Sequence, residues 1–155
     1  MRRADREIKE NEKLKEILTQ AQVVRVGYQD EQGMAIVPLN YGVVWEGELP
    51  VLYIHSAKEG RKVSAFSQGG TVAVEIDCGS QVVEHERPCG YSCRYRSIMG
   101  SAQVRRVEEP GEKTLGLNAI MEHYSGRRWD FPPEAVERVA VFALTVTQLS
   151  GKEHL

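Results

Sequence analysis

The chain has 155 residues, and its 20 Lys and Arg against 22 Asp and Glu give a formal net charge of −2. A length near ~150 residues predicts one domain over residues 1–155, and the balanced charge argues against a dedicated nucleic-acid binder. With 41% apolar residues, global disorder is excluded. Neither a membrane-spanning run of about 20 apolar residues nor a signal peptide is found, so we expect a cytoplasmic protein without a membrane partner.

Hydrophobic periodicity predicts an N-terminal helix within residues 1–20, with a narrow apolar stripe from Leu14 to Ala21. Two β-branched runs follow at residues 23–28 and 34–44. The Gly-containing turn between them is typical of a β-hairpin. Pro38 lacks a backbone N–H, so it indicates a sheet edge, a bulge or a strand break.

A third strand is predicted at residues 51–55, followed by a short helix at 61–66. Residues 71–77 alternate in polarity, which is typical of a half-buried strand. The polar segment 78–92 is expected to be a loop. A long strand follows at 95–107, where Gly100 indicates a bulge or a close approach of two backbones.

A second long helix is predicted at residues 110–126, with Pro110 in its first turn and Gly126 as its C-terminal cap. After a short turn at Pro132 and Pro133, a strand at 139–149 closes the chain. The strands within 23–107 and 139–149 number about six, arranged as hairpins and a meander. This order favours a mainly β, α+β fold, an antiparallel barrel with flanking helices, over a doubly wound parallel sheet.

The segment His55–Lys62 carries the clearest functional signal. A hydroxyl, small residues and an Arg-Lys pair follow a strand and begin a helix, where unpaired backbone N–H groups favour an anion. Arg61 can hold phosphate oxygens with two parallel hydrogen bonds, and Lys62 adds a point charge. A solvated basic turn that merely begins a helix is an equally good interpretation of these residues alone. His55 itself fits a histidine at the edge of the core.

Other clusters carry weaker signals. Tyr95 next to Arg96 suits a flat anionic ligand, or simply a half-solvated strand face. A metal site from His85, Cys89 and Cys93 lacks the C-x-x-C pairs of zinc sites, so we expect no metal and free thiols. The sequence also has no G-x-G-x-x-G segment, Walker lysine loop or G-x-S-x-G elbow.

The order of several segments resembles one protein family. They are Arg-Arg-Ala-Asp-Arg-Glu-Ile near the N-terminus, Val37–Gly42, Tyr53–Lys62, Val74–Asp77, Tyr91–Gly100 and Ile120–Tyr124, before a Thr-rich strand that ends at Lys152. Together they are similar to the pyridoxamine 5'-phosphate oxidase-like, FMN-binding split-barrel proteins, and within them to the nitroimidazole-resistance (Nim) group. The resemblance spans nearly the whole chain.

This resemblance implies a six-stranded antiparallel split β-barrel that forms a homodimer, with FMN bound between the subunits. Arg61 and Lys62 would then bind the FMN phosphate. The implied cofactor-binding residues are Pro38, Leu39, Asn40, Tyr41, His55, Ser56, Ala57, Gly60, Arg61 and Lys62, joined by Tyr95, Arg96 and Ser97 from the dimer partner. His55 takes the position of the histidine suspected of a catalytic role in the Nim group.

The implied function is an FMN-dependent oxidoreductase of the nitroaromatic reductase type, with an electron donor that the sequence leaves unidentified. FMN transfers electrons, and the protein's task is to bind and tune it. One alternative is a flavin-binding protein without catalysis. Another is a split barrel that binds haem, through His55 or His123, or a deazaflavin. A pyridoxamine-phosphate oxidase proper is the weakest alternative, because its substrate-binding residues do not stand out.

Overall fold

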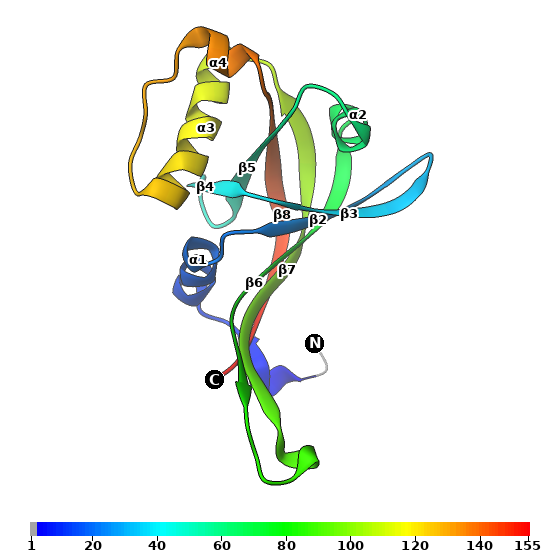
Figure 1. Ribbon diagram of the computed structural model, residues 1–155, viewed down its shortest axis with the longest axis vertical. Helices are drawn as coiled ribbons and strands as arrows, with labels where there is room; N and C mark the ends of the chain where they lie inside the picture. Colours follow the sequence, from blue (N-terminus) through cyan, green and yellow to red (C-terminus); the bar gives the residue numbers. More distant parts are fainter. Residues whose placement is uncertain (1–2) are drawn as a thin grey trace.

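The computed structural model describes residues 3–155, which form a strongly bent antiparallel sheet with helices packed against it (Figure 1). Its strands are β1 (Glu7–Ile8), β2 (Val24–Asp30), β3 (Gly33–Leu39), β4 (Tyr41–Trp45), β5 (Pro50–Ser56), β6 (Gly70–Val83), β7 (Ser92–Val107) and β8 (Ala140–His154). Its α-helices are α1 (Asn11–Gln20), α2 (Arg61–Ser67), α3 (Pro110–Ser125) and α4 (Pro133–Glu137). Short 3₁₀ turns lie at Ala4–Arg6 and Pro88–Gly90.

The sheet closes into a split barrel at Asn40. Its strand order is β3-β2-β6-β7-β8-β5-β4, so β3 and β4 form opposite edges. These two strands are nevertheless separated in the chain by Asn40 alone, so the sheet must curl until its edges meet. No ladder joins β3 to β4 within the described residues, which leaves the barrel split along this line. The predicted antiparallel split barrel is confirmed.

The prediction of six strands was wrong, because residues 3–155 contain eight. The single strand expected at 34–44 is two strands, since the chain passes from one sheet edge to the other at Asn40. Pro38 lies in edge strand β3, just before this break, as its missing N–H led us to expect. The β2–β3 hairpin is confirmed, with the register Asp30 opposite Gly33.

The N-terminal helix was predicted too long. Helix α1 begins at Asn11, and Glu7–Ile8 instead form strand β1 against Gly151 and Lys152 of β8. Ile8 is buried, and it packs over Gly151, where an added Cβ atom would lie 3.0 Å from the Cβ of Ile8. The periodic stripe that indicated the helix began only at Leu14. Residues 1 and 2 of the predicted helix lie outside the described residues.

The predicted loop at 78–92 was also wrong in part. Strand β6 continues to Val83 and β7 begins at Ser92, so the two form a long hairpin that projects from the barrel (Figure 1). Most side chains of this arm are exposed on both faces, and a strand without a buried face shows no polar–apolar alternation. A further difference is α4, a short helix where the sequence predicted only a turn at Pro132–Pro133.

Two apolar cores hold the fold together. Alternate residues of β6 and β8, among them Val74, Ile76, Phe142 and Leu144, fill the barrel interior, as their spacing predicted. The opposite face of β8 lies under α3 and α4, where Val141 belongs to a second buried cluster. The fold therefore has layers on both sides of its central strands.

Several local predictions are confirmed. Gly126 ends α3 in the left-handed conformation, with φ +70°, and its N–H donates to the carbonyl of Glu122. At the other end, α3 begins at Pro110 as predicted. The cap itself was not predicted: the carboxylate of Glu109 accepts from the N–H groups of Gly111 and Glu112. At Gly100, a Cβ would lie 2.2 Å from the carbonyl oxygen of Gln148, so two backbones do approach closely there.

The contact of α3 with β4 gives a testable prediction about stability. A Cβ at Gly42 would lie 2.2 Å from the carbonyl carbon of Ala119 and 2.3 Å from the amide nitrogen of Ile120. Because both are backbone atoms, neither can swing aside. We expect Gly42→Ala to lower the free energy of unfolding by at least about 2 kcal/mol, measured by urea denaturation.

Gly27→Ala is the matched control, because its Cβ would meet Ala73 at an ordinary 3.5 Å. Both glycines lie in strands and neither has a positive φ, so the two variants differ mainly in the space available. Equal losses of stability in the two variants would contradict the proposed close packing of α3 on β4.

Candidate functional site

Ser56 is the last residue of β5 and carries a buried hydroxyl. Its Oγ atom has no hydrogen-bond partner among the described residues. A buried polar group without a partner costs roughly 1–3 kcal/mol, so such groups are rare without a role. The adjoining residue Ala57 is exposed. This end of β5 is therefore a place where a bound acceptor would satisfy a donor.

His55 precedes Ser56 but leaves the strand on the opposite face. In the ladder with β8, His55 pairs with Val141, which lies in the cluster under α3 and α4, whereas Ser56 pairs with Ala140 of the barrel interior. Although the His55 side chain reaches solvent, the surrounding protein removes enough water from the ring to lower its pKa. The imidazole is therefore neutral at pH 7 and offers one N–H donor.

Gly60, Arg61 and Lys62 complete the turn. Gly60 has φ +129°, a conformation that favours glycine, and it precedes the seven-residue helix α2. Arg61 is exposed, and its guanidinium donates to both carboxylate oxygens of Asp30, with Nε–Oδ2 and Nη2–Oδ1 distances of 2.8 Å. Lys62 is half-buried next to it. Residues 56–62 thus hold three basic side chains (Lys58, Arg61 and Lys62), one acidic side chain (Glu59) and a hydroxyl without a partner among the described residues.

The strand segment Pro38–Tyr41 offers mainly its backbone. The Tyr41 side chain is buried, and its hydroxyl donates to the carbonyls of Leu18 and Ala21. The side-chain Nδ2 of Asn40 donates to the hydroxyl of Tyr124 at 2.7 Å. These side chains fasten the split between β3 and β4 to α1 and α3, while Pro38 remains exposed on the edge strand.

Tyr95, Arg96 and Ser97 lie at the base of the β6–β7 arm, and the structure divides them between two faces. Arg96 lies within 4 Å of the carboxylates of Glu16 and Glu153, where it helps to hold α1. The hydroxyl of Tyr95 accepts from Arg6 at 3.4 Å, and this contact lowers the pKa of Tyr95. Within one chain the contacts of these residues therefore lead to the N-terminal segment and β8, rather than to the 56–62 turn.

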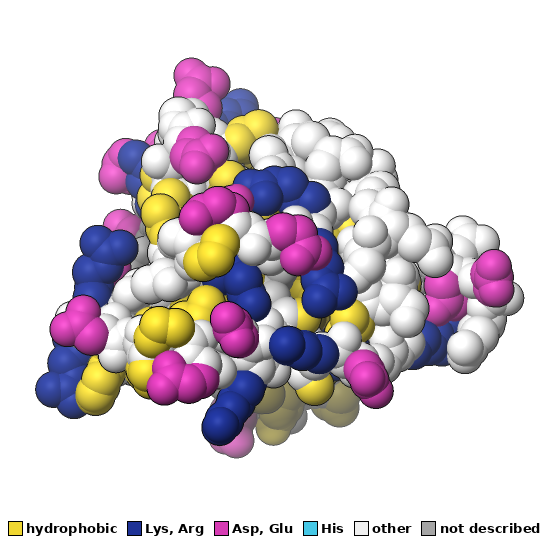
Figure 2. Space-filling model, turned by 90° about the horizontal axis from the view of Figure 1, so that it is seen from above, with side chains coloured by type: hydrophobic (Ala, Val, Ile, Leu, Met, Phe, Trp, Pro, Cys, Tyr) yellow, Lys and Arg dark blue, Asp and Glu magenta, His cyan; other side chains and the backbone are white. Residues whose placement is uncertain are grey.

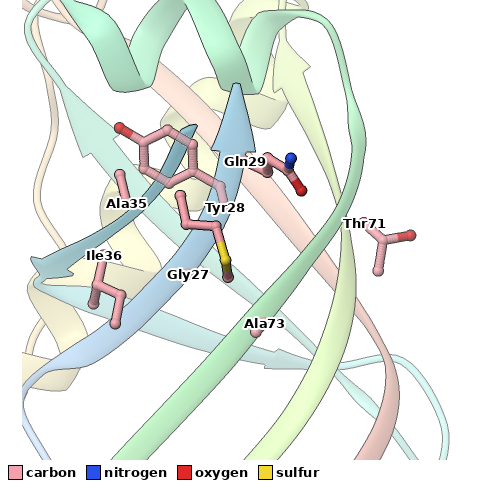
Figure 3. A pocket seen from close by; sticks show the side chains of 8 residues that line it. Gly27, Tyr28, Gln29, Ala35, Ile36, Thr71 and Ala73 are labelled. Carbon is pink, nitrogen blue, oxygen red and sulfur yellow. The ribbon is translucent and has the colours of Figure 1, made fainter. Parts of the chain in front are cut away.

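An apolar hollow on the outer face of the sheet was not predicted. It has a volume of about 630 Å³, within the range of small-molecule sites, and lies over β2, β3 and β6 (Figure 3). Its lining residues are Gly27, Tyr28, Gln29, Met34, Ala35, Ile36, Thr71 and Ala73. Met34 and Ile36 are 85% and 74% exposed, which is unusual for large apolar side chains. The sequence did hold a signal for this apolar surface: the residues at successive positions of β3 are apolar, so both faces of the strand are apolar.

The geometry gives less support to a haem ligand at His123 and to a metal site at His85, Cys89 and Cys93. His123 donates from Nε2 to the carbonyl of Ala21 at 2.6 Å, so that nitrogen is already bonded. His85 accepts through Nδ1 from the N–H of Arg87. Between residues 3 and 155 no three His, Cys, Asp or Glu side chains gather into a possible metal site. The three cysteines are free thiols.

The charges of the surface are mixed. Figure 2 shows acidic and basic side chains interspersed over the face seen from above, which agrees with the net charge of −2. None of the helices between residues 3 and 155 is long and apolar enough to cross a membrane.

Comparison with known proteins places the chain in a family. Residues 10–153 match the pyridoxamine 5'-phosphate oxidase family. A Bacteroides thetaiotaomicron protein, provisionally described as a 5-nitroimidazole antibiotic resistance protein, is 31% identical with a TM-score of 0.80; the match covers 95% of this chain and 86% of that one. No curated protein matches the chain.

Two more distant structures share the fold. The flavocytochrome Anf3 of Azotobacter vinelandii is 18% identical with a TM-score of 0.80, over 100% of this chain and 72% of that one. An FAD and heme binding protein of Mycobacterium smegmatis is 19% identical with a TM-score of 0.80, over 96% and 73%. Because the family match spans most of its length, the chain belongs to the pyridoxamine 5'-phosphate oxidase family, and within it resembles the nitroimidazole-resistance proteins.

Proposed function

We propose that the protein binds FMN and holds the FMN phosphate on the 56–62 turn. The observation that carries this proposal is the buried hydroxyl of Ser56, which lacks a partner among the described residues and lies on the same turn as Arg61 and Lys62. A phosphate oxygen would accept from that hydroxyl and from both cations. Helix α2 has only seven residues, so the side chains rather than its dipole support the proposal.

The remaining predicted residues would surround the flavin ring. Ala57 and Gly60 leave room along the turn, and the Pro38–Tyr41 backbone lies at the split of the barrel, where edge groups are free to bind a ligand. Because the side chain of Tyr41 is already engaged with α1, we assign it a positioning role, with only its backbone facing the cofactor.

We further propose that the site is completed by a second copy of the chain. Met34 and Ile36 expose large apolar surfaces on the outer sheet face. Met99 on β7 is 51% exposed and lines one hollow together with Ile36, with Gly27 and Ala73 between them. Exposed apolar patches of this kind mark protein–protein contacts. In such a homodimer Tyr95, Arg96 and Ser97 would approach the cofactor of the partner.

The activity that this site supports best is reduction of nitroaromatic compounds. When bound, FMN supplies the one- or two-electron chemistry. The neutral ring of His55 would donate a hydrogen bond to the nitro group, and the 31% identical Bacteroides protein supports this substrate class. The electron donor is an unidentified reductant.

Lys62 tests the phosphate contact. We expect Lys62→Ala to weaken FMN binding about 10-fold or more, because one charge-assisted hydrogen bond is lost, while riboflavin, which lacks the phosphate, is bound almost unchanged. Flavin fluorescence quenching measures both affinities. The visible spectrum and the mass of the flavin released from the purified protein distinguish FMN from FAD.

Arg138→Ala, which removes an exposed cation after α4, is the control and should bind FMN normally. An equal loss of FMN and riboflavin affinity in Lys62→Ala would reject the phosphate role. A wild-type protein that binds neither FMN nor FAD would reject the proposed function.

His55 tests the catalytic role. In the FMN-loaded protein, reduced with dithionite under anaerobic conditions, we expect His55→Ala to slow oxidation by a 5-nitroimidazole about tenfold, with FMN affinity unchanged. His55→Gln keeps an N–H donor and should retain part of the rate. Stopped-flow absorbance gives these rates. Unchanged rates in His55→Ala would remove its role, and no reaction in the wild type would favour the non-catalytic flavin protein.

Ile36 tests the dimer. We expect the wild type to be a dimer in light scattering and Ile36→Asp to be a monomer, because the new carboxylate would be buried without a partner. Val82→Asp, at a position 63% exposed on the arm, is the control and should stay dimeric. A monomeric wild type would contradict the homodimer.

A further inference from the structure

The β2–β3 turn presents a fixed carboxylate. Gly33 has φ +104°, which lets the chain reverse after Asp30, and the N–H of Gln32 donates to Asp30 Oδ1 at 2.9 Å. The Asp30 side chain is only 18% exposed. The backbone of the turn therefore holds one of the two carboxylate oxygens of Asp30.

Asp30 in turn fixes the guanidinium of Arg61. Nε and Nη2 of Arg61 donate to the two carboxylate oxygens at 2.8 Å, and Nη2 also donates to the carbonyl of Gly33 at 3.2 Å. The ring of Tyr28 lies close by, with its centre 5.9 Å from the guanidinium carbon. Three of the five N–H donors of Arg61 are used in this way, so the two donors of Nη1 remain for a ligand.

The ion pair persists over a wide pH range. The hydrogen bonds from Arg61 hold the pKa of Asp30 below its ordinary value. The carboxylate therefore stays charged at neutral and mildly acidic pH, and the position of Arg61 does not depend on small changes in pH.

We propose that Asp30 is a positioning residue for phosphate recognition, which holds Arg61 so that its Nη1 donors face the FMN phosphate. This inference rests on the proposed FMN site. A free arginine side chain carries rotamer freedom that it must lose when it is immobilised, and Asp30 imposes that order before the ligand binds. Asp30 would therefore favour flavins with a phosphate without touching the flavin.

The experiment compares Asp30→Asn with the wild type for FMN and for riboflavin, by fluorescence quenching. The asparagine amide keeps an oxygen for the Gln32 N–H but loses the charge and the second acceptor for Arg61. We expect FMN affinity to fall about tenfold while riboflavin affinity stays within about twofold, in line with the effect of residues that orient a ligand-binding side chain at other sites. Glu31→Gln, on the same turn and exposed, is the matched control and should change neither.

A second comparison separates positioning from general stability. In an Arg61→Ala background, removal of Asp30 should have no further effect on FMN affinity, because the residue acts through Arg61. If Asp30→Asn unfolds, Asp30→Ser retains an oxygen for the turn and takes its place in both comparisons.

Each other outcome overturns the inference. Tighter FMN binding in Asp30→Asn would make Asp30 a competitor of the phosphate, and an equal loss of riboflavin would make it a structural residue only. If removal of Asp30 still changed FMN affinity in the Arg61→Ala background, Asp30 would not act through Arg61, and the proposed positioning role would be wrong. The proposed function fails separately, if the wild type binds no flavin at all.

Discussion

The fold depends on burying both faces of β8. This strand pairs with β7 along most of its length and with β5 over Ala140–Thr145, and it also receives β1 near its end. Phe142 and Leu144 point into the barrel, and Val141 and Ala143 lie under α3 and α4. A one-residue shift in register would exchange the side chains of the two faces, so that Phe142 and Leu144 would have to pack under the helices and both cores would be disrupted. The sheet is therefore fixed at its centre.

The two edge strands of the sheet, β3 and β4, are held in place by helices instead. At the split of the barrel, α1 and α3 meet around Tyr41, whose hydroxyl binds the end of α1 and whose ring packs 4.8 Å from that of His123. The backbone of α3 also rests directly on Gly42. These contacts hold β3 and β4 close together, although no ladder joins them within the described residues. Strand edges at this split keep backbone groups that a closed barrel would have paired.

Sequence patterns predicted the fold best where one face of an element is buried. The alternation in β6 led to a correct strand, because water on one side and core on the other impose a period. Pro110 and Gly126 at the two ends of α3 led to a correct helix. The prediction for the β6–β7 arm failed for the opposite reason, since both of its faces meet solvent. Strand β1 was missed because its two residues are stabilised by a distant partner, β8, which no local pattern reveals.

The candidate site was predictable to a similar degree, since the residue types of the 56–62 turn suggested an anion and the family resemblance placed that turn within a flavin site. The direction of each side chain was not predictable: His55 and Ser56 are neighbours that face different layers, and Arg61 is oriented by Asp30, which precedes it by 31 residues in the chain.

The burial of β5 explains why the candidate site lies where it does. Within this strand every residue from Val51 to Ile54 is buried, so it has no polar side chain exposed until it leaves the core at His55. Directly after it come the buried hydroxyl of Ser56 and the cations of α2, on a turn that lies between the two cores. The hairpin turn with Asp30 reaches the same helix from a different part of the sheet. A ligand that binds there meets groups already ordered by the folding of the barrel, which lowers the entropy lost on binding.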